Sequence, residues 1–483
     1  MNVCFITSEC VPYAKTGGLA DVSGALPKAL AELGCAVKVF MPLYDSIDTR
    51  LHNLVFSEDL YEIPVQIGNR SVVFNTWFGN LGDSGVKVHF IDCPLYYHRS
   101  SIYTSDGDEN ERYILLQHAA FKIMQRYNWS PDVLHCNDWQ SGLVPAMAKN
   151  IYHWDELFRE SVSVLTVHNI AYQGAFDPQD IYKTGLPSSM VAKGGPLEHN
   201  GAMSFMKGGI VYADAVTSVS PTYAKEIQQP QYGAGLDAIL RTYHHKLTGI
   251  LNGIDTDVWS PGQDTYIKPR YTVKTLNKKQ RVKANLLKKF GLEYDEERPL
   301  FGIISRLTPQ KGFELLQPIL SHLLQTSNMQ LVVLGSGEES SEQFFQLAKD
   351  LYPEQVAVFV GYNNELAHWI EAGADFFIMP SRFEPCGLNQ MYSLAYGTLP
   401  IVRKTGGLAD TVIDVYSDPE NGNGLVFEDF TSYALLTTIQ RALEIYSDSD
   451  ALETIRLRGM NADFSWTRSA EKYVALYNRL KYA

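Results

Sequence analysis

The stretch NVCFITSECVPYAKTGGLADVSGALPKALAELGCAVKVFMP, residues 2–42, decides the fold of the first half of the chain. Residues 2–7 form a short apolar run, and residues 22–33 carry apolar side chains at helical spacing. Gly34 can end that helix, and residues 35–42 are again apolar and strand-like. The stretch therefore predicts a βαβ unit whose first loop is rich in glycine.

Apolar, strand-like runs recur along the whole chain and fall into two series. The first series continues at 86–92, 131–136, 162–168, 213–220 and 245–252. The second series lies at 299–307, 329–337, 356–362, 374–381 and 398–407. Strands that alternate with helical segments predict a mostly parallel sheet with helices on both faces. We therefore expect an α/β fold made of two doubly wound, Rossmann-like halves in tandem.

Two segments mark the boundaries of these halves. The stretch near 255–275 is polar and contains Pro and Gly, and residues 464–483 have the pattern of one amphipathic helix. We predict an N-terminal domain of residues 1–248, which the helix at 464–483 crosses back to join. Residues 249–463 form the predicted C-terminal domain.

The composition is that of an ordinary soluble globular protein and argues against several classes. The 483 residues are 45% hydrophobic and 20% charged, and the formal net charge is −13. This charge disfavours nucleic acid and anionic membranes as partners, and no apolar run approaches the about 18 residues of a membrane span. The N-terminus lacks the features of a signal peptide, and the six cysteines form no C-x-x-C pair. We expect reduced thiols and a cytoplasmic protein, or a plastid stromal one if the chain is a trimmed plant or algal protein.

The sequence KTGGLAD occurs twice, at 15–21 and at 404–410. Ligands of open α/β sheets bind beyond the carboxyl ends of the strands, so two sheets that face each other would bring both copies to one cleft. A glycine pair lets backbone approach an anion, and the helix start that follows offers free N–H groups. The alternative is that the glycines only make a tight turn. No G-x-G-x-x-G or Walker A pattern supports a dinucleotide or P-loop site.

Two basic residues follow the first strand of the second series. Arg306 stands at the end of that strand, and Lys311 follows in the loop SRLTPQKG, residues 305–312. Two cations near one site can neutralise a diphosphate without a metal, and no convincing D-x-D loop motif is present, so we expect neither a metal nor a cofactor. The alternative is a solvated loop with two ordinary basic side chains.

Residues 382–392, RFEPCGLNQMY, place Glu384 at a strand-to-helix transition. The carboxylate, with the backbone N–H groups of 387–389 beside it, suits a site where both positive and negative charge develop; a helix-capping role is the alternative. We expect Cys386 to be packed rather than nucleophilic. His168 follows the strand at 162–168, where it is either structural or part of the site.

An acid beside an aromatic side chain is a common arrangement for binding sugars. Asp138 and Trp139 give that pair in HCNDWQ, and Tyr97 lies in PLYYHRS. The chain contains 28 Tyr and 7 Trp, however, so each of these rings could equally serve packing.

These motifs occur together in a known order. The N-terminal KTGGLAD, HNIAYQG, SPTYA, LNGID, SRLTPQKG, RFEPCGLNQMY and YGTLPIVRKTGGLADTV together resemble bacterial glycogen synthases and plant starch synthases. These enzymes form glycosyltransferase family 5 and have the GT-B fold. The resemblance covers essentially the whole chain.

The resemblance implies a retaining transfer of glucose from ADP-glucose to the non-reducing end of an α-1,4-glucan, without a metal. It assigns catalytic roles at the diphosphate and the donor glucose to His168, Arg306, Lys311 and Glu384. The implied donor-binding residues are Lys15, Gly17, Gly18, Asp21, Asn252, Tyr362, Cys386, Gly387, Leu388 and Asn389. The implied acceptor-binding residues are Tyr97, Asp138 and Trp139. We expect a monomer or small homo-oligomer whose two domains close around the donor, with hinges near 249–256 and 464–483.

One position departs from the wider pattern of retaining GT-B enzymes. The E-x₇-E motif would place a second Glu eight residues after Glu384, where this chain has Tyr392. Tyr at this position is usual for the family 5 subgroup, so the departure narrows the family. Two other functions stay open: a glucan phosphorylase, whose pyridoxal-phosphate lysine motif is not found, and a catalytically weak glucan-binding or initiation scaffold. The second KTGGLAD either lines the cleft or supports the helix that bears Glu384.

Overall fold

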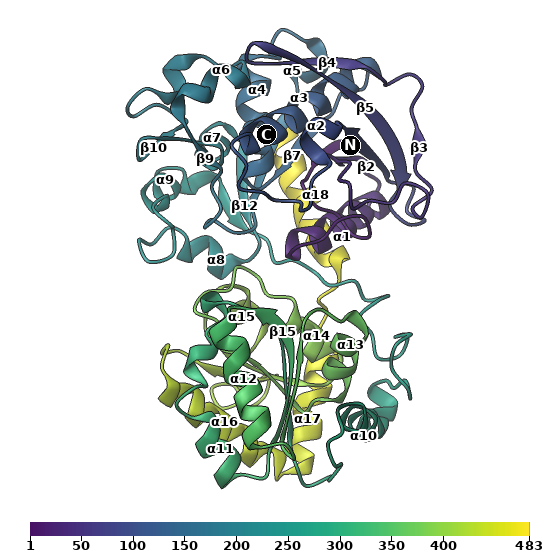
Figure 1. Ribbon diagram of the computed structural model, residues 1–483, viewed down its shortest axis with the longest axis vertical. Coiled ribbons are helices and arrows are strands. Elements are labelled where there is room, and N and C mark those ends of the chain that lie inside the picture. Colours follow the sequence, from purple (N-terminus) through teal and green to yellow (C-terminus); the bar gives the residue numbers. More distant parts are fainter. Residues whose placement is uncertain (483) are drawn as a thin grey trace. The chain divides into compact units, whose positions relative to one another are not determined.

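The computed structural model describes residues 1–482 and divides the chain into two compact units. Unit 1 comprises Met1–Gly253 together with the C-terminal segment from Trp466, and unit 2 comprises Ile254–Ser465. The sequence prediction set these boundaries at 248/249 and 463/464. Each unit is a sheet covered by helices (Figure 1).

Unit 1 is built on one large, mostly parallel sheet. Its strand order, within residues 1–482, is β13-β12-β8-β7-β1-β2-β6-β5-β3, with β4 paired to β5. The parallel strands are β1 (Asn2–Ile6), β2 (Ala36–Pro42), β6 (Lys87–Asp92), β7 (Val133–Asn137), β8 (Val162–Val167), β12 (Ala215–Ser218) and β13 (Leu247–Gly249). Each of these strands was predicted from an apolar run, and the predicted parallel sheet is confirmed.

An antiparallel edge completes this sheet and was not predicted. It consists of β3 (Val55–Phe56), β4 (Ile63–Ile67) and β5 (Arg70–Asn80), which joins the sheet antiparallel to β6. In β4, buried and exposed side chains alternate, as is typical of a half-buried strand. A smaller sheet, in the order β10-β11-β9, is formed by β9 (Ala175–Phe176), β10 (Glu198–His199) and β11 (Ala202–Ser204).

The helices of unit 1 connect and cover these strands. They are α1 (Gly18–Glu32), α2 (Pro94–Tyr97), α3 (Glu109–Arg126), α4 (Val144–Asn150), α5 (Glu156–Arg159), α6 (Ile181–Thr184), α7 (Phe205–Tyr212), α8 (Pro221–Glu226), α9 (Asp237–Thr242) and α18 (Trp466–Tyr482). The predicted C-terminal amphipathic helix is α18, which packs against α1 (Figure 1). Its buried Tyr477 hydroxyl lies 2.5 Å from Nδ1 of His135 on β7. This contact ties the end of the chain to the sheet of unit 1.

Unit 2 is a parallel sheet with a separate hydrophobic layer on each face. Its order is β16-β15-β14-β17-β18-β19, formed by β14 (Leu300–Leu307), β15 (Gln330–Gly337), β16 (Val356–Val360), β17 (Phe376–Met379), β18 (Leu399–Arg403) and β19 (Leu425–Phe427). Along β15, Leu331 and Val333 belong to one core cluster, whereas Val332 and Leu334 belong to the other. Alternate side chains of a strand point to opposite faces, so both faces are buried under helices, as predicted for a doubly wound sheet.

The helices of unit 2 divide between these two layers. They are α10 (Lys279–Phe290), α11 (Leu320–Thr326), α12 (Glu339–Leu351), α13 (Asn364–Gly373), α14 (Asn389–Ala395), α15 (Gly406–Thr411), α16 (Ser432–Tyr446) and α17 (Ser449–Met460). Side chains of α11, α12 and α16 join one cluster, and side chains of α10 and α13 join the other. No helix within residues 1–482 is long and apolar enough to cross a membrane.

Candidate active site

The first KTGGLAD forms the loop between β1 and α1. The Nζ atom of Lys15 lies 2.7 Å from Oδ1 of Asp21, on the first turn of α1. A Cβ atom added at Gly17 or Gly18 would meet nothing within 4 Å, and neither glycine has a positive φ. Neither packing nor backbone conformation therefore requires these glycines, and the space beside them is open.

The N–H groups of this loop are not all free, which corrects the expectation from sequence. Gly17 N–H donates to Oε2 of Glu9 at 3.1 Å, and Thr16 N–H donates to the same oxygen. The Thr16 hydroxyl donates to Oε1 of Glu9 at 2.7 Å. A side chain of the protein already occupies part of the position that an anion would take at the start of α1.

Asp138 and His168 lie together at the carboxyl ends of β7 and β8. Oδ1 of Asp138 accepts the His168 backbone N–H at 2.7 Å. Nε2 of His168 is 2.9 Å from Oδ1 of Asn137, whose Nδ2 donates to the Ile6 carbonyl. Because that amide is fixed by the carbonyl, its oxygen accepts from Nε2–H, and the lone pair of the imidazole is on Nδ1. The sequence predicts a catalytic role for His168 and an acceptor-binding role for Asp138, and the structure places the two residues in direct contact.

Burial sets the charge of both groups. It raises the pKa of Asp138 to about 7, with the nearby Glu9 charge adding to the effect and the N–H groups of His168 and Asn169 opposing it. It lowers the pKa of His168 to about 3, so this imidazole is neutral near pH 7. Asp138 also has a φ of +53°, a left-handed conformation that non-glycine residues rarely adopt and that is frequent at functional sites.

Two predicted acceptor residues are packed in the core instead. Tyr97 is fully buried, and its hydroxyl donates to the Arg112 carbonyl at 2.7 Å. Trp139 is 8% exposed, and its ring makes an edge contact with Tyr113 at 4.9 Å and lies directly against Gly174. The structure therefore corrects the expectation that the rings of Tyr97 and Trp139 offer a flat face to a sugar. Their polar neighbours in the sequence do not determine the direction in which these side chains point. The Tyr97 side chain is not accessible to solvent.

Asn252, a predicted nucleotide contact, lies near the end of unit 1. Its side chain is nearly buried, and its Oδ1 has no hydrogen-bond partner within residues 1–482. A buried acceptor without a donor is unfavourable, so the position is consistent with a polar group that arrives with a ligand.

In unit 2 the predicted carboxylate pairs with one of the two predicted cations, in the loops that follow β17 and β14. Nζ of Lys311 lies 2.6 Å from Oε2 of Glu384, and the Ser381 hydroxyl donates to the same oxygen at 3.0 Å. Arg306, near the end of β14, is exposed and has no ion-pair partner within the described residues 1–482. One cation is therefore held by a carboxylate of the site, and the other is available to an anion.

The second KTGGLAD supports the loop that carries Glu384. Gly406 has a φ of +45°, and a Cβ there would lie 1.8 Å from the Glu384 carbonyl oxygen. A Cβ at Gly407 would lie 2.0 Å from the Cys386 carbonyl oxygen, and Gly407 N–H donates to the Glu384 carbonyl at 3.1 Å. Of the two roles open from sequence, the structure therefore shows the supporting one. Lys404, exposed, pairs with Glu428 at 2.5 Å and not with the acid of its own motif.

A glycine turn connects Glu384 to the start of α14. Gly387 has a φ of +68°, a conformation that favours glycine, and Leu388 precedes the first residue of the helix, Asn389. Nδ2 of Asn389 donates to the Ile304 carbonyl at 2.8 Å, which ties α14 to β14. Cys386 is buried, as expected for a packed thiol.

Tyr362 and Tyr392, the two aromatic residues singled out in the second half, have opposite environments. Tyr362 follows β16 and is 79% exposed, so its ring is open to a planar ligand. Tyr392 is buried and stacks on Trp259 at 3.9 Å, and Trp259 stacks in turn on His368 at 3.9 Å. This stack holds the first turn of α14 against the segment that opens unit 2.

Comparison with known proteins gives the family of the chain. Residues 2–242 match the family model of the starch synthase catalytic domain, and residues 286–455 match that of glycosyl transferases group 1. The chain is 43% identical to the glycogen synthase of Myxococcus xanthus over 493 residues, which cover 99% of both chains. It is 40% identical to the glycogen synthase of Bacillus cereus over 480 residues, 99% of this chain and 100% of that one. The chain belongs to the glycogen and starch synthase family.

Solved structures give the fold of this family member. The catalytic domain of starch synthase IV from Arabidopsis thaliana, bound to ADP and acarbose, superposes with a TM-score of 0.93 at 33% identity, over 100% of this chain and 99% of that one. Sucrose-phosphate synthase from Thermosynechococcus elongatus shares the fold, with a TM-score of 0.62 at 18% identity over 99% of this chain and 98% of that one. The GT-B fold and the family resemblance expected from sequence are confirmed, and the protein is a glycosyltransferase of this type.

Two residues near the site were missed from sequence. Glu9 lies in the loop just after β1, where parallel sheets often place site residues, and that position alone could have indicated it. Trp259 lies in the polar segment between the two halves, and nothing in the sequence indicates its stack.

Proposed function

We propose that this protein transfers glucose from ADP-glucose to the non-reducing end of an α-1,4-glucan, with retention of the α configuration. Membership of the glycogen and starch synthase family supports a glucosyl transfer to glucan. The similar starch synthase IV domain binds ADP, which is the leaving group that an ADP-glucose donor would produce.

The observation that carries the proposal is the Lys311–Glu384 pair, in the same unit as the exposed Arg306 near the end of β14. Departure of the diphosphate builds negative charge on its oxygens and positive charge on the sugar ring. Arg306 and Lys311 would neutralise the diphosphate, and no metal would be required for this step. Glu384 would accept a hydrogen bond from a donor glucose hydroxyl while it orients Lys311, which it contacts at 2.6 Å.

Unit 1 would contribute the groups around the sugar and the acceptor. The open space at Gly17 and Gly18 would let the donor approach the backbone, with Lys15 and Asp21 beside it. The neutral His168 would accept a hydrogen bond from a sugar hydroxyl at Nδ1 without adding charge near the reacting carbon. The departing phosphate itself would take the proton of the acceptor hydroxyl, so a second catalytic carboxylate at glycosidase spacing is not needed.

The test is a measurement of ADP release with a maltooligosaccharide acceptor, run with ADP-glucose and with UDP-glucose. Glu384→Ala is the active-site control, and the acceptor is analysed by mass for the addition of glucose. We expect release with ADP-glucose, loss of release in Glu384→Ala, and elongation by α-linked glucose units that NMR identifies from the anomeric proton.

Other outcomes would change the proposal in defined ways. A strong preference for UDP-glucose would keep the transferase and replace the donor. Tight glucan binding without release from either donor would favour the scaffold function. We further propose that the enzyme is cytoplasmic and acts as a monomer or small homo-oligomer. Light scattering of the purified protein would test the oligomeric state.

A further inference from the structure

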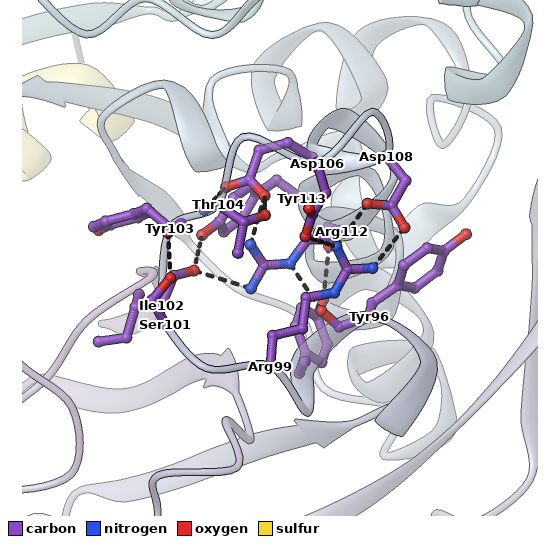
Figure 2. A network of polar contacts seen from close by, with 12 residues as sticks. Tyr96, Arg99, Ser101, Ile102, Tyr103, Thr104, Asp106, Asp108, Arg112 and Tyr113 are labelled. Carbon is purple, nitrogen blue, oxygen red and sulfur yellow. Dashed lines mark hydrogen bonds and ion pairs between the residues drawn. The ribbon is translucent and has the colours of Figure 1, made fainter.

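The segment 98–108 between α2 and α3 is fixed to unit 1 by two arginines (Figure 2). Arg99 binds Asp106 at 2.7 Å and Asp108 at 2.6 Å, so it closes the segment on itself. Arg112, fully buried on α3, donates to the Ile102 carbonyl at 2.9 Å and pairs with Glu109 at 2.5 Å. The two arginines bind both ends and the middle of this segment, so its side chains have defined positions.

Tyr103 reaches from this segment to the end of β1. Its hydroxyl donates to Oε1 of Glu9 at 2.5 Å and lies 2.8 Å from the Ser8 hydroxyl. The two residues are 94 positions apart in the chain. Tyr103 therefore connects the segment 98–108 to the carboxylate that binds the KTGGLAD loop.

Both carboxylate oxygens of Glu9 accept hydrogen bonds. It is 2% exposed and has no ion-pair partner within residues 1–482, so N–H and O–H groups stabilise its charge. Two of those donors are backbone N–H groups at the start of α1, where the helix dipole favours a negative charge. Thr16 and Gly18 are themselves exposed, so the loop is fixed through Glu9 and is not packed into the core.

We propose that Glu9, held by Tyr103, is a positioning residue that fixes residues 15–18 in the conformation that binds the donor. This inference rests on the proposed function for its kinetic consequence and on the structure for its conformational one. Because both carboxylate oxygens of Glu9 are hydrogen-bonded, the loop holds Lys15, Gly17 and Gly18 at fixed positions relative to the end of β1. Without Glu9, water replaces it at the exposed Thr16, and the loop loses its fixed conformation while the fold persists.

The loop conformation is tested by amide hydrogen exchange of peptides that cover residues 11–20. In Glu9→Ala we expect the Thr16 and Gly17 amides to exchange about tenfold faster or more, because each loses a charged acceptor. Glu9→Gln should retain protection: its amide oxygen can accept both N–H groups, and its NH₂ can donate to the hydroxyl oxygens of Thr16 and Tyr103. This measurement does not depend on catalysis, so it stands even if the proposed reaction fails.

The kinetic test compares KM for ADP-glucose and kcat in the same variants. We expect Glu9→Ala to lower kcat/KM by about 10- to 100-fold, mainly through KM, and Glu9→Gln to restore it to within about fivefold of wild type. Tyr103→Phe, which removes one of the two donors to Oε1 of Glu9, should show a smaller change in the same direction. Asp214→Ala is the matched control, because Asp214 likewise accepts the backbone N–H and the hydroxyl of one residue, Ser163, at 2.8 Å each.

The outcomes separate the inference from the proposed function. Unchanged exchange and unchanged donor KM in Glu9→Ala would overturn the inference, as would an equal loss in Asp214→Ala. Tighter binding of ADP in Glu9→Ala would also overturn it, because Glu9 would then compete with the ligand. If Glu9→Ala fails to fold, Tyr103→Phe and Glu9→Gln decide the question. A wild-type protein without transfer would reject the proposed function and leave the exchange result to judge Glu9.

Discussion

Lys311 and Glu384 form a close ion pair, 2.6 Å between Nζ and Oε2, although 73 residues separate them in the chain. Both side chains are largely buried, and the Ser381 hydroxyl donates to the same carboxylate oxygen. Such a pair orients each partner for a ligand that carries charge of both signs. A diphosphate would bind the ammonium group, and the glucose would bind the carboxylate.

Removing either member of this pair should abolish most activity without unfolding unit 2. We expect Lys311→Ala and Glu384→Ala each to lower kcat by about 10²–10³, as for other preorganised charged groups, and the double variant to lose less than the product of the two. Steady-state ADP release measures the effect. Lys289→Ala is the control because it breaks an exposed pair in the same unit, with Glu365 at 2.9 Å, and should change kcat by less than about twofold. Additive losses would show that the two residues act independently.

The two KTGGLAD glycine pairs should respond differently to the same substitution. Gly18→Ala adds a Cβ to open space at the start of α1, so the melting temperature should be unchanged while KM for ADP-glucose rises about tenfold. Gly406→Ala places a Cβ 1.8 Å from the Glu384 carbonyl oxygen at a φ of +45°. We expect a loss of about 1–3 kcal/mol of stability together with loss of activity.

Calorimetry and ADP-release assays on both variants check this contrast. An active, thermally stable Gly406→Ala would mean that the second motif does not support the Glu384 loop. An unchanged KM for ADP-glucose in Gly18→Ala would mean that the donor does not bind against Gly18.

The sheets of this protein could be predicted because their parallel strands are continuous apolar runs. β14 and β15 are buried on both faces, so the runs at 299–307 and 329–337 stand out from their surroundings. The antiparallel edge strand β4 has an exposed face, and its alternation IPVQI is too short to distinguish from a loop. The sequence therefore predicts the strands that are buried on both faces, but not the edge strand with one face exposed to solvent.

The charged site residues could be predicted because they follow strand ends, whereas the direction of a side chain could not. Arg306, Glu384 and His168 all lie near the carboxyl ends of strands, which is where parallel sheets place ligands. Tyr97 is also near such an end, but it points into the core. The role of Glu9 depends on Tyr103, and a contact over 94 residues leaves no local pattern.

The pH dependence of stability should reveal the buried Asp138. Its pKa of about 7 is above that of the unfolded chain, so its contribution to stability is complete below about pH 4 and is lost as pH rises through 7. Asp138→Asn cannot ionise and keeps an oxygen for the His168 N–H. The melting temperature of the variant relative to wild type should therefore be higher at pH 8.5 than at pH 5. A constant difference would show that Asp138 ionises normally.

Unit 1 should lose stability on acidification because it contains four buried, neutral histidines. Burial lowers the pKa of His118 to about 4 and lowers the pKa of His89, His135 and His168 to about 3. A depressed folded pKa means that stability is complete above about pH 6.5 and is lost as pH falls, by about 1.4 kcal/mol per pH unit for each histidine. Hydrogen exchange at pH 7 and pH 5 should show faster exchange of the unit 1 core at the lower pH, because these four histidines lie in unit 1.

Substitution of His89 tests whether the protonation of one buried histidine contributes to the loss of stability at low pH. His89 is buried and stacks on Phe40 at 4.8 Å, and its Nδ1 has no hydrogen-bond partner within residues 1–482. His89→Phe keeps an aromatic ring against Phe40 and removes the protonation site. We expect the slope of the unfolding free energy against pH, between about pH 6 and 4.5, to fall by one proton, about 1.4 kcal/mol per pH unit. An unchanged slope would mean that His89 is protonated only after unit 1 has opened by another route.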